Sequence, residues 1–171
     1  NFLNSPLAID YMVGSMITMA TDELASARMG SGLSLGDPEE EHDCFSDLSH
    51  LAIYHNLQGV KNAFYGTYQS ETYDISGASL ATLVNNKNAA TFEAVDTALT
   101  SIEGKMVQIL DAGERDISPV KFDQIIGQPS NGVERLIAES AVTELIALDT
   151  ELELMAEVLA LENIDTEFDG D

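Results

Sequence analysis

The chain has 171 residues, enough for one domain with a hydrophobic core and too few for two ordinary ones. Its 30 acidic residues outnumber 7 basic ones, and the formal net charge of −23 disfavours nucleic acid and anionic membranes as partners. Abundant Ala, Leu and Glu, with no Trp, favour helices over sheets.

Cysteine usage and hydropathy say little about the compartment. Cys44 is the only cysteine, so no internal disulfide is possible. No apolar run approaches the roughly 20 residues that span a bilayer, so we expect no transmembrane segment. The sequence opens at Asn1 without an initiator methionine or a basic leader, and we expect a processed or trimmed product.

The first predicted helix begins at Asn4-Ser5-Pro6, where a capping side chain precedes proline, and ends at Gly30-Ser31-Gly32. Asp37-Pro38 begins a second element, and Ser46 to Ser49 predicts a break or kink in it. Helical spacing of apolar residues and turn residues between them predict the remaining helices, which run from that break to about 65, then over 78–84, 89–110, 119–126 and 133–161.

We see no strand pattern and interpret 66–77 as a connector. The predicted fold is therefore all-α, an up-down bundle of four to five major helices plus short linking helices. We assign 1–162 to this domain and 163–171 to an acidic, frayed tail.

The segment 36–50 concentrates the ionisable side chains, with many carboxylates, two of the three histidines and the cysteine. If it is helical, Glu39, His42 and Ser46 share one face, and Glu-x-x-His is the spacing by which bundle helices present two ligands to one metal. The motif does not recur, so we do not expect a complete metal site in this chain. The alternative interpretation is a helix start with solvated glutamates.

Two further expectations concern neighbouring side chains. Arg28 lies just upstream, and we expect it to form a salt bridge with Glu41 or Asp47. The surrounding carboxylates should raise the pKa of Cys44 and prevent it from acting as a nucleophile, so we expect a small buried residue beside Phe45. The aromatic residues that follow are Tyr54, His55, Tyr65, Tyr68 and Tyr73. Either they rim a pocket with their polar tips, or the tyrosines lie at the edge of the core with their hydroxyls hydrogen-bonded.

The run Gly36-Asp37-x-Glu39-x-Glu41-His42-x-Cys44-Phe45-Ser46-Asp47-x-x-His50, preceded by Arg28-Met29, closely resembles the imelysin-like family, which includes bacterial iron-regulated protein A. The similarity continues through Asn56-x-x-Gly59-Val60-x-Asn62, Tyr65-Gly66-x-Tyr68, Ser79-Leu80-x-x-Leu83-Val84 and Phe122-Asp123-Gln124-x-Ile126.

This resemblance implies an exported protein, periplasmic or attached to the outer membrane, that takes part in iron uptake. Family members have two helical halves with a presumed site at their junction, and the chain resembles only the second half. The first half's Gly-x-His-x-x-Glu motif is absent here, and Asp43, Leu48 and Ser49 replace the more usual Ser, Asn and Thr.

Our first hypothesis is a non-enzymatic domain that binds iron or another divalent cation weakly through residues 39–50. Its partners would be the first-half domain, another copy of the chain, or iron-uptake machinery. The predicted metal ligands are His42, Glu41, Asp47 and His50, and the predicted site-lining residues are Arg28, Glu39, Glu41, Ser46, Asp47 and Tyr54.

Two other hypotheses remain open. The chain is either a fragment of a metallopeptidase that needs the first half, with a carboxylate as general base and His42 as ligand, or a structural module whose acids only confer solubility. We assign no catalytic residue.

Overall fold

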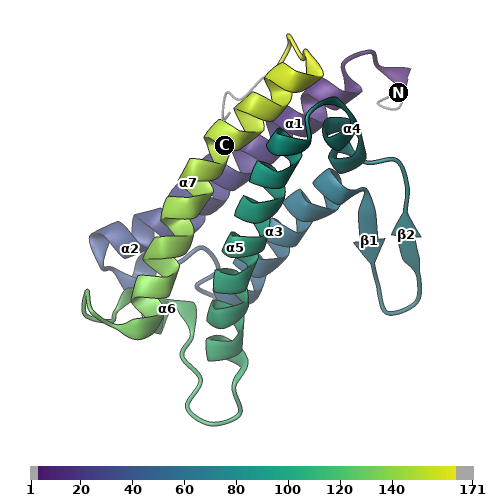
Figure 1. Cartoon of the computed structure of the whole chain (residues 1–171). Helices are drawn as coiled ribbons and strands as arrows, with labels where there is room; N and C mark the ends of the chain where they lie inside the picture. The colour runs from purple at the N-terminus through teal and green to yellow at the C-terminus, as the bar shows by residue number, and fades with distance from the viewer. Residues whose placement is uncertain (1–3, 165–171) are drawn as a thin grey trace.

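In the computed structural model, which describes residues 4–164, four long helical stretches pack side by side (Figure 1). Helix α7 (Val133–Leu159) packs against α5 (Ala89–Glu114) and against the N-terminal stretch, and α3 (Ser49–Tyr65) packs against both α5 and that stretch. The short helices are α4 (Leu80–Lys87), which packs on α5, and α6 (Phe122–Ile126). The predicted all-α bundle is confirmed.

The N-terminal stretch is longer than predicted and changes its helical period. It comprises α1 (Ala8–Thr18), a π-helical segment (Met19–Gly30) and α2 (Ser31–Leu35) without interruption. Side chains five residues apart are therefore neighbours in its middle, so that the Ser26 hydroxyl donates to the Thr21 carbonyl and the Ser31 hydroxyl to that of Ser26.

The predicted helix end at Gly30-Ser31-Gly32 is wrong. The helix continues to Leu35 and ends at Gly36, whose φ of 65° is left-handed and whose N–H donates to the Gly32 carbonyl. Gly32 instead permits close packing, because an added Cβ would lie 2.6 Å from Ile126 Cδ1.

The second predicted element is only the 3₁₀ turn Pro38–Glu40, where the Asp37 carboxylate accepts a hydrogen bond from the Glu39 N–H. The predicted break is confirmed, since residues 41–48 are not helical and α3 begins at Ser49.

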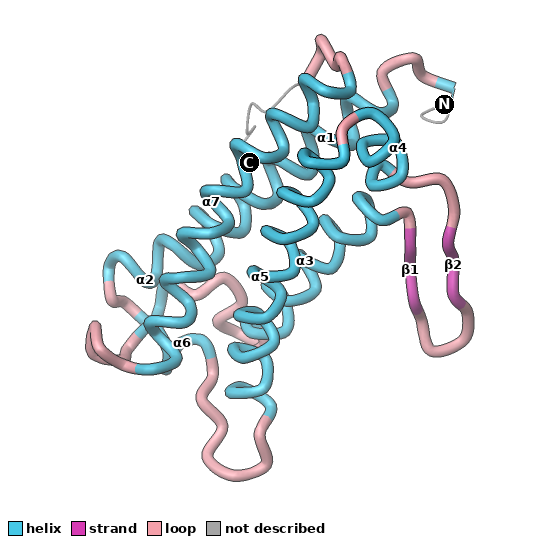
Figure 2. Tube along the Cα trace, in the orientation of Figure 1, coloured by secondary structure: helices cyan, strands magenta, loops and turns pink. Residues whose placement is uncertain are grey.

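The connector after α3 contains strands that the sequence analysis missed. Strand β1 (Thr67–Gln69) pairs antiparallel with β2 (Asp74–Ser76), with Tyr68 opposite Ile75, and the hairpin projects from the bundle as an arm (Figure 2). Three residues per strand are too few to show an alternating pattern in the sequence.

Apolar faces of the long helices meet in one hydrophobic core. Helix α6 closes one end of the core with Phe122, Ile125 and Ile126, each fully buried. Val133, in the first turn of α7, is exposed. Within residues 4–164, no helix combines the length and apolarity that a membrane crossing requires. The predicted tail lies largely outside the described residues, although the Asn163 N–H donates to Asp10.

Arg135 joins three segments at the α6 end of the bundle. From the first turns of α7, its guanidinium donates to the backbone carbonyls of Ile126, Gln128 and, at 2.6 Å, Leu33, and it also pairs with Glu139. Carbonyls at helix ends have no partner within their own helix, so this one side chain satisfies acceptors at the ends of both α2 and α6.

Arg135→Ala should therefore lower the free energy of unfolding by about 2–3 kcal/mol, measured by urea denaturation, because several partly buried carbonyls lose a charged donor. Arg135→Lys should restore only part of the loss, since an ammonium cannot reproduce the planar fork. Arg115→Ala is the control. Its ion pair with Glu134 lies at the surface, so we expect a change below about 1 kcal/mol, and equal losses for Arg115 and Arg135 would contradict this role.

Candidate functional site

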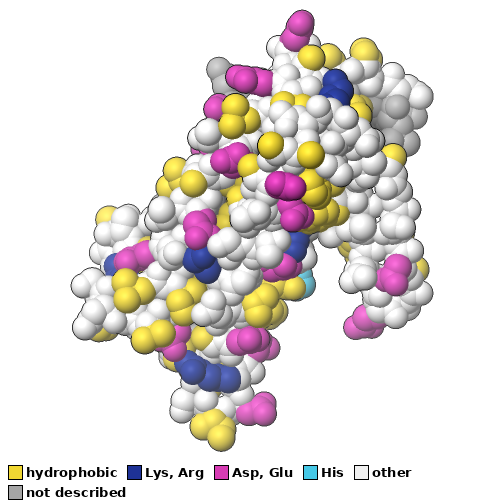
Figure 3. Space-filling view, viewed as in Figure 1, with side chains coloured by type: hydrophobic (Ala, Val, Ile, Leu, Met, Phe, Trp, Pro, Cys, Tyr) yellow, Lys and Arg dark blue, Asp and Glu magenta, His cyan; other side chains and the backbone are white. Residues whose placement is uncertain are grey.

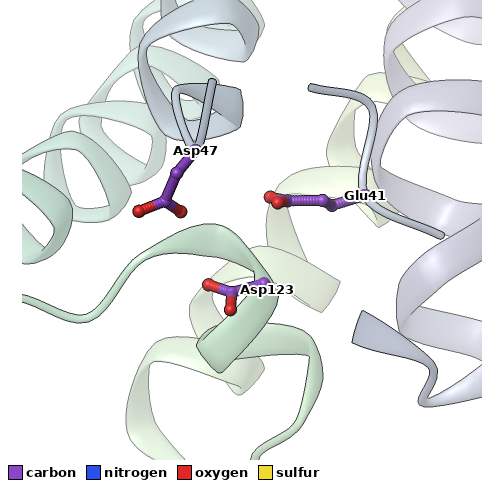
Figure 4. Close-up of side chains that lie close together, drawn as sticks. All are labelled: Glu41, Asp47 and Asp123. Atoms are coloured by element: carbon purple, nitrogen blue, oxygen red, sulfur yellow. The ribbon is translucent and has the colours of Figure 1, made fainter. Parts of the chain in front are cut away.

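The loop that precedes α3 is folded tightly on itself. The Asp43 N–H donates to the buried Ser49 hydroxyl at 2.9 Å, and the Asp47 N–H donates to the Asp43 carbonyl. Asp47 has a φ of 57°, a left-handed conformation that Asp tolerates better than most residues. This turn directs the Asp47 side chain towards α6 (Figure 4).

Three carboxylates from separate segments meet there. Glu41, Asp47 and Asp123 each offer one oxygen, and these oxygens lie within 4.8 Å of one another. Glu41 comes from the start of the loop, Asp47 from its final turn and Asp123 from α6, and the three side chains converge in Figure 4. We call these residues the acid cluster.

The acid cluster runs from the interior to the surface. Glu41 is 8% exposed, Asp123 is half-buried and Asp47 is exposed. Glu41 Oε2 and Asp123 Oδ1 are both buried, and neither accepts a hydrogen bond from the described residues. Burial raises the pKa of Glu41, and the negative charges of Asp123, Asp47 and Asp43 raise it further, while the Ser49 hydroxyl partly offsets them.

His42 points away from the acid cluster, towards the π-helical segment. Its Nε2 lies 3.4 Å from Arg28 Nη1, and both burial and the Arg28 charge lower the pKa of His42, which favours the neutral imidazole. The predicted salt bridge from Arg28 to Glu41 or Asp47 is wrong. Arg28 pairs with Glu23 at 2.8 Å, because the π-helical period aligns residues five apart.

His50 is fully buried near the start of α3. Its Nε2 lies 2.7 Å from Glu114 Oε1 and 3.2 Å from Lys121 Nζ. The hydrogen bonds that Glu114 makes with His50 and with Lys121 lower the pKa of Glu114. The Nδ1 of His50 is buried without a hydrogen-bond partner among the described residues. The ring packs on Gly113 of α5, where an added Cβ would lie 2.3 Å from His50 Cδ2.

The structure thus brings together Glu41 and Asp47 of the predicted metal ligands and groups neither His42 nor His50 with them. Among the predicted lining residues, Glu39 and Ser46 are exposed beside the loop, and Tyr54 borders a separate cleft. Asp123 was missed as a site residue. The sequence feature that could have indicated Asp123 is its position in the Phe122-Asp123-Gln124 turn, which supports the family resemblance.

Cys44 was expected to be a small buried residue beside Phe45, and this is wrong, since both residues are exposed. The expected direction of the thiol pKa is confirmed, since desolvation and the charges of Glu39 and Glu41 raise the pKa of Cys44.

These features define a helical-bundle protein with an oxygen-rich cluster where the loop before α3 meets α6. The chain belongs to the imelysin family, described as Imelysin (Peptidase_M75), whose family pattern it matches over residues 3–152. The resemblance predicted from the Glu-His-x-Cys-Phe-Ser-Asp segment is confirmed at the level of the family. No curated protein matches the chain.

Gly113→Ala should destabilise the fold by about 1–3 kcal/mol, because the new methyl group overlaps the buried His50 ring. Gly104→Ala on the same helix is the matched control. An added Cβ there meets nothing within 4 Å, so the variant should gain up to about 1 kcal/mol from helix propensity. Thermal unfolding of both variants tests whether Gly113 packs against the His50 ring. Equal changes in melting temperature for the two variants would contradict this packing.

The raised pKa of Glu41 makes a second prediction. Its ionised form costs stability in the folded protein, and that cost appears as the pH rises through and above the ordinary value of 4.5. In chelator-treated buffer, Glu41→Gln should therefore be more stable than wild type by on the order of 1 kcal/mol at neutral pH. The gain should vanish at low pH, where Glu41 of the wild type is protonated in both the folded and the unfolded state. Urea denaturation measures the gain, with Glu40→Gln at an exposed neighbour as the control for the loss of one surface carboxylate. A destabilised Glu41→Gln would refute the argument.

Proposed function

We propose that this imelysin-family domain binds a hard metal cation at the acid cluster. The observation that carries the proposal is Glu41, a buried carboxylate with one oxygen unpartnered among the described residues, which faces two more carboxylates. An all-oxygen donor set of this kind suits Mg²⁺, Ca²⁺, Mn²⁺ or iron in preference to soft metals.

The distribution of positive charge supports the proposal. Six of the seven basic residues form ion pairs with acids outside the acid cluster, and no Lys or Arg in residues 4–164 pairs with Glu41, Asp47 or Asp123. The three negative charges therefore lack a counter-ion from the protein. Burial and, secondly, the neighbouring negative charges raise the pKa of Glu41, and a bound cation would offset both effects by stabilising the ionised carboxylates.

Three side-chain ligands leave coordination positions for water or for ligands from elsewhere, so we infer weak binding by this chain alone. The family resemblance supports iron as the physiological cation and iron uptake as the process. It also supports an exported protein whose first-half domain, or a second copy of the chain, completes the site.

Calorimetric titration with Mn²⁺, Ca²⁺, Zn²⁺ and, under argon, Fe²⁺ tests the site, with 0.15 M KCl to screen non-specific attraction to the acidic surface. We expect one saturable site with a Kd on the order of 0.1–1 mM for the harder cations. At a hundredfold excess over Kd, binding should stabilise the fold by about 2.7 kcal/mol, which a thermal shift can detect.

Asp123→Asn and Asp47→Asn should each weaken binding at least tenfold, and Asn keeps the left-handed turn accessible at position 47. The matched control is Asp116→Asn, an exposed acid in the loop between α5 and α6. Equal affinity in wild type and Asp123→Asn, or equal losses in Asp123→Asn and Asp116→Asn, would reject the acid cluster as the site.

A further inference from the structure

A cleft runs along α3, between this helix, α5 and the hairpin. Its volume is about 820 Å³, within the range of small-molecule sites. The hollow between the hairpin arm and the helical body is visible in Figure 3. None of the three acid-cluster residues lines this cleft, so the cleft is separate from the acid cluster.

Aromatic side chains form part of the wall of this cleft. Tyr54 and Tyr65 come from α3 and Tyr68 from β1, and all three line the space. Tyr68 is 47% exposed, although it contacts Tyr73 across the hairpin with ring centroids 6.1 Å apart. Such rings offer flat apolar faces to a ligand that also carries polar groups.

Neutral polar groups line the rest of the cleft. Asn62 and Gln69 contribute amides with both donors and acceptors, and His55 contributes an exposed imidazole. Gly59 faces open space, since an added Cβ would meet nothing within 4 Å, so the middle of α3 leaves room above its backbone.

The two charged residues in the cleft neutralise each other. Lys61 Nζ forms an ion pair with Glu103, and Gln58 donates to the same carboxylate at 2.8 Å. The Lys61 ammonium also lies 5.9 Å from the centre of the Tyr65 ring and so occupies the position that a cationic ligand would take. An anionic ligand is disfavoured by the net charge of −23.

We propose that this cleft binds an uncharged, polyhydroxylated ligand of saccharide size. The apolar C–H faces of a sugar ring pack on tyrosine rings, while its hydroxyls both donate and accept hydrogen bonds and so match the amides of Asn62 and Gln69. The neutral Lys61–Glu103 pair supplies further polar partners without selecting a charge. This site is independent of the acid cluster and does not rest on the proposed cation binding.

Tyrosine fluorescence provides a direct test, because the chain has no tryptophan and three of its five tyrosines line the cleft. The full chain is titrated with maltose, cellobiose and N,N′-diacetylchitobiose, with choline chloride and inorganic phosphate as charged comparators. Saturation-transfer NMR on the same samples reports direct contact with the sugar. We expect at least one disaccharide to give a saturable change that is the same in 0.05 M and 0.5 M NaCl, because no net charge is involved.

Tyr68→Ala should weaken that binding at least about fivefold through loss of the ring face. Asn62→Ala, on α3, gives a second variant that leaves the hairpin intact, and it should weaken binding as well. The matched control is Tyr11→Ala, which removes a tyrosine of similar exposure from α1 and should leave the affinity unchanged.

Three results would overturn the proposal. The first is no response to any of the disaccharides at 20 mM, and the second is an undiminished response in both Tyr68→Ala and Asn62→Ala. The third is saturable binding of choline or phosphate that exceeds binding of every sugar.

Discussion

The arrangement of the acid cluster depends on the hydrogen bonds that the Arg135 guanidinium donates to backbone carbonyls. A helix that ends inside a protein leaves its last carbonyls without partners, and both α2 and α6 end beside α7. Arg135 satisfies carbonyls at both ends, so α2 and α6 are held at one point. Glu41 follows α2 after a single turn, and Asp123 lies within α6, so their approach follows from this junction.

Within the described part of the chain, the distribution of charge leaves the acid cluster without a positively charged side chain to pair with. The chain has 7 basic residues and 30 acidic ones, so most of its acids have no basic partner. Most of the basic residues form ion pairs along the long helices or between them, as Lys105 does with Glu144. The acid cluster is left with a buried, unpartnered carboxylate oxygen at Glu41. Burial of such a group costs stability, and folded proteins accept that cost most often at sites where charge is used.

The π-helical segment shows how backbone period decides which side chains meet. In an ordinary α-helix Arg28 and Glu23 would lie on different faces and would not pair. The i to i+5 spacing joins them instead and leaves Arg28 close enough to His42 to lower the pKa of that imidazole. The loop's histidine is thereby turned away from its carboxylates.

The amino-acid sequence by itself determined the helical class, the break before Ser49 and the family, because these depend on local periodicity, turn residues and short motifs. It also indicated Glu41 and Asp47, since the segment around them concentrates carboxylates. Only the tertiary structure decided that Asp123 joins them, that His50 is buried between α5 and Lys121, and that Cys44 faces solvent. Those outcomes depend on contacts between residues as many as 82 positions apart, as for Glu41 and Asp123, and no local pattern records which distant segments a helix junction will bring together.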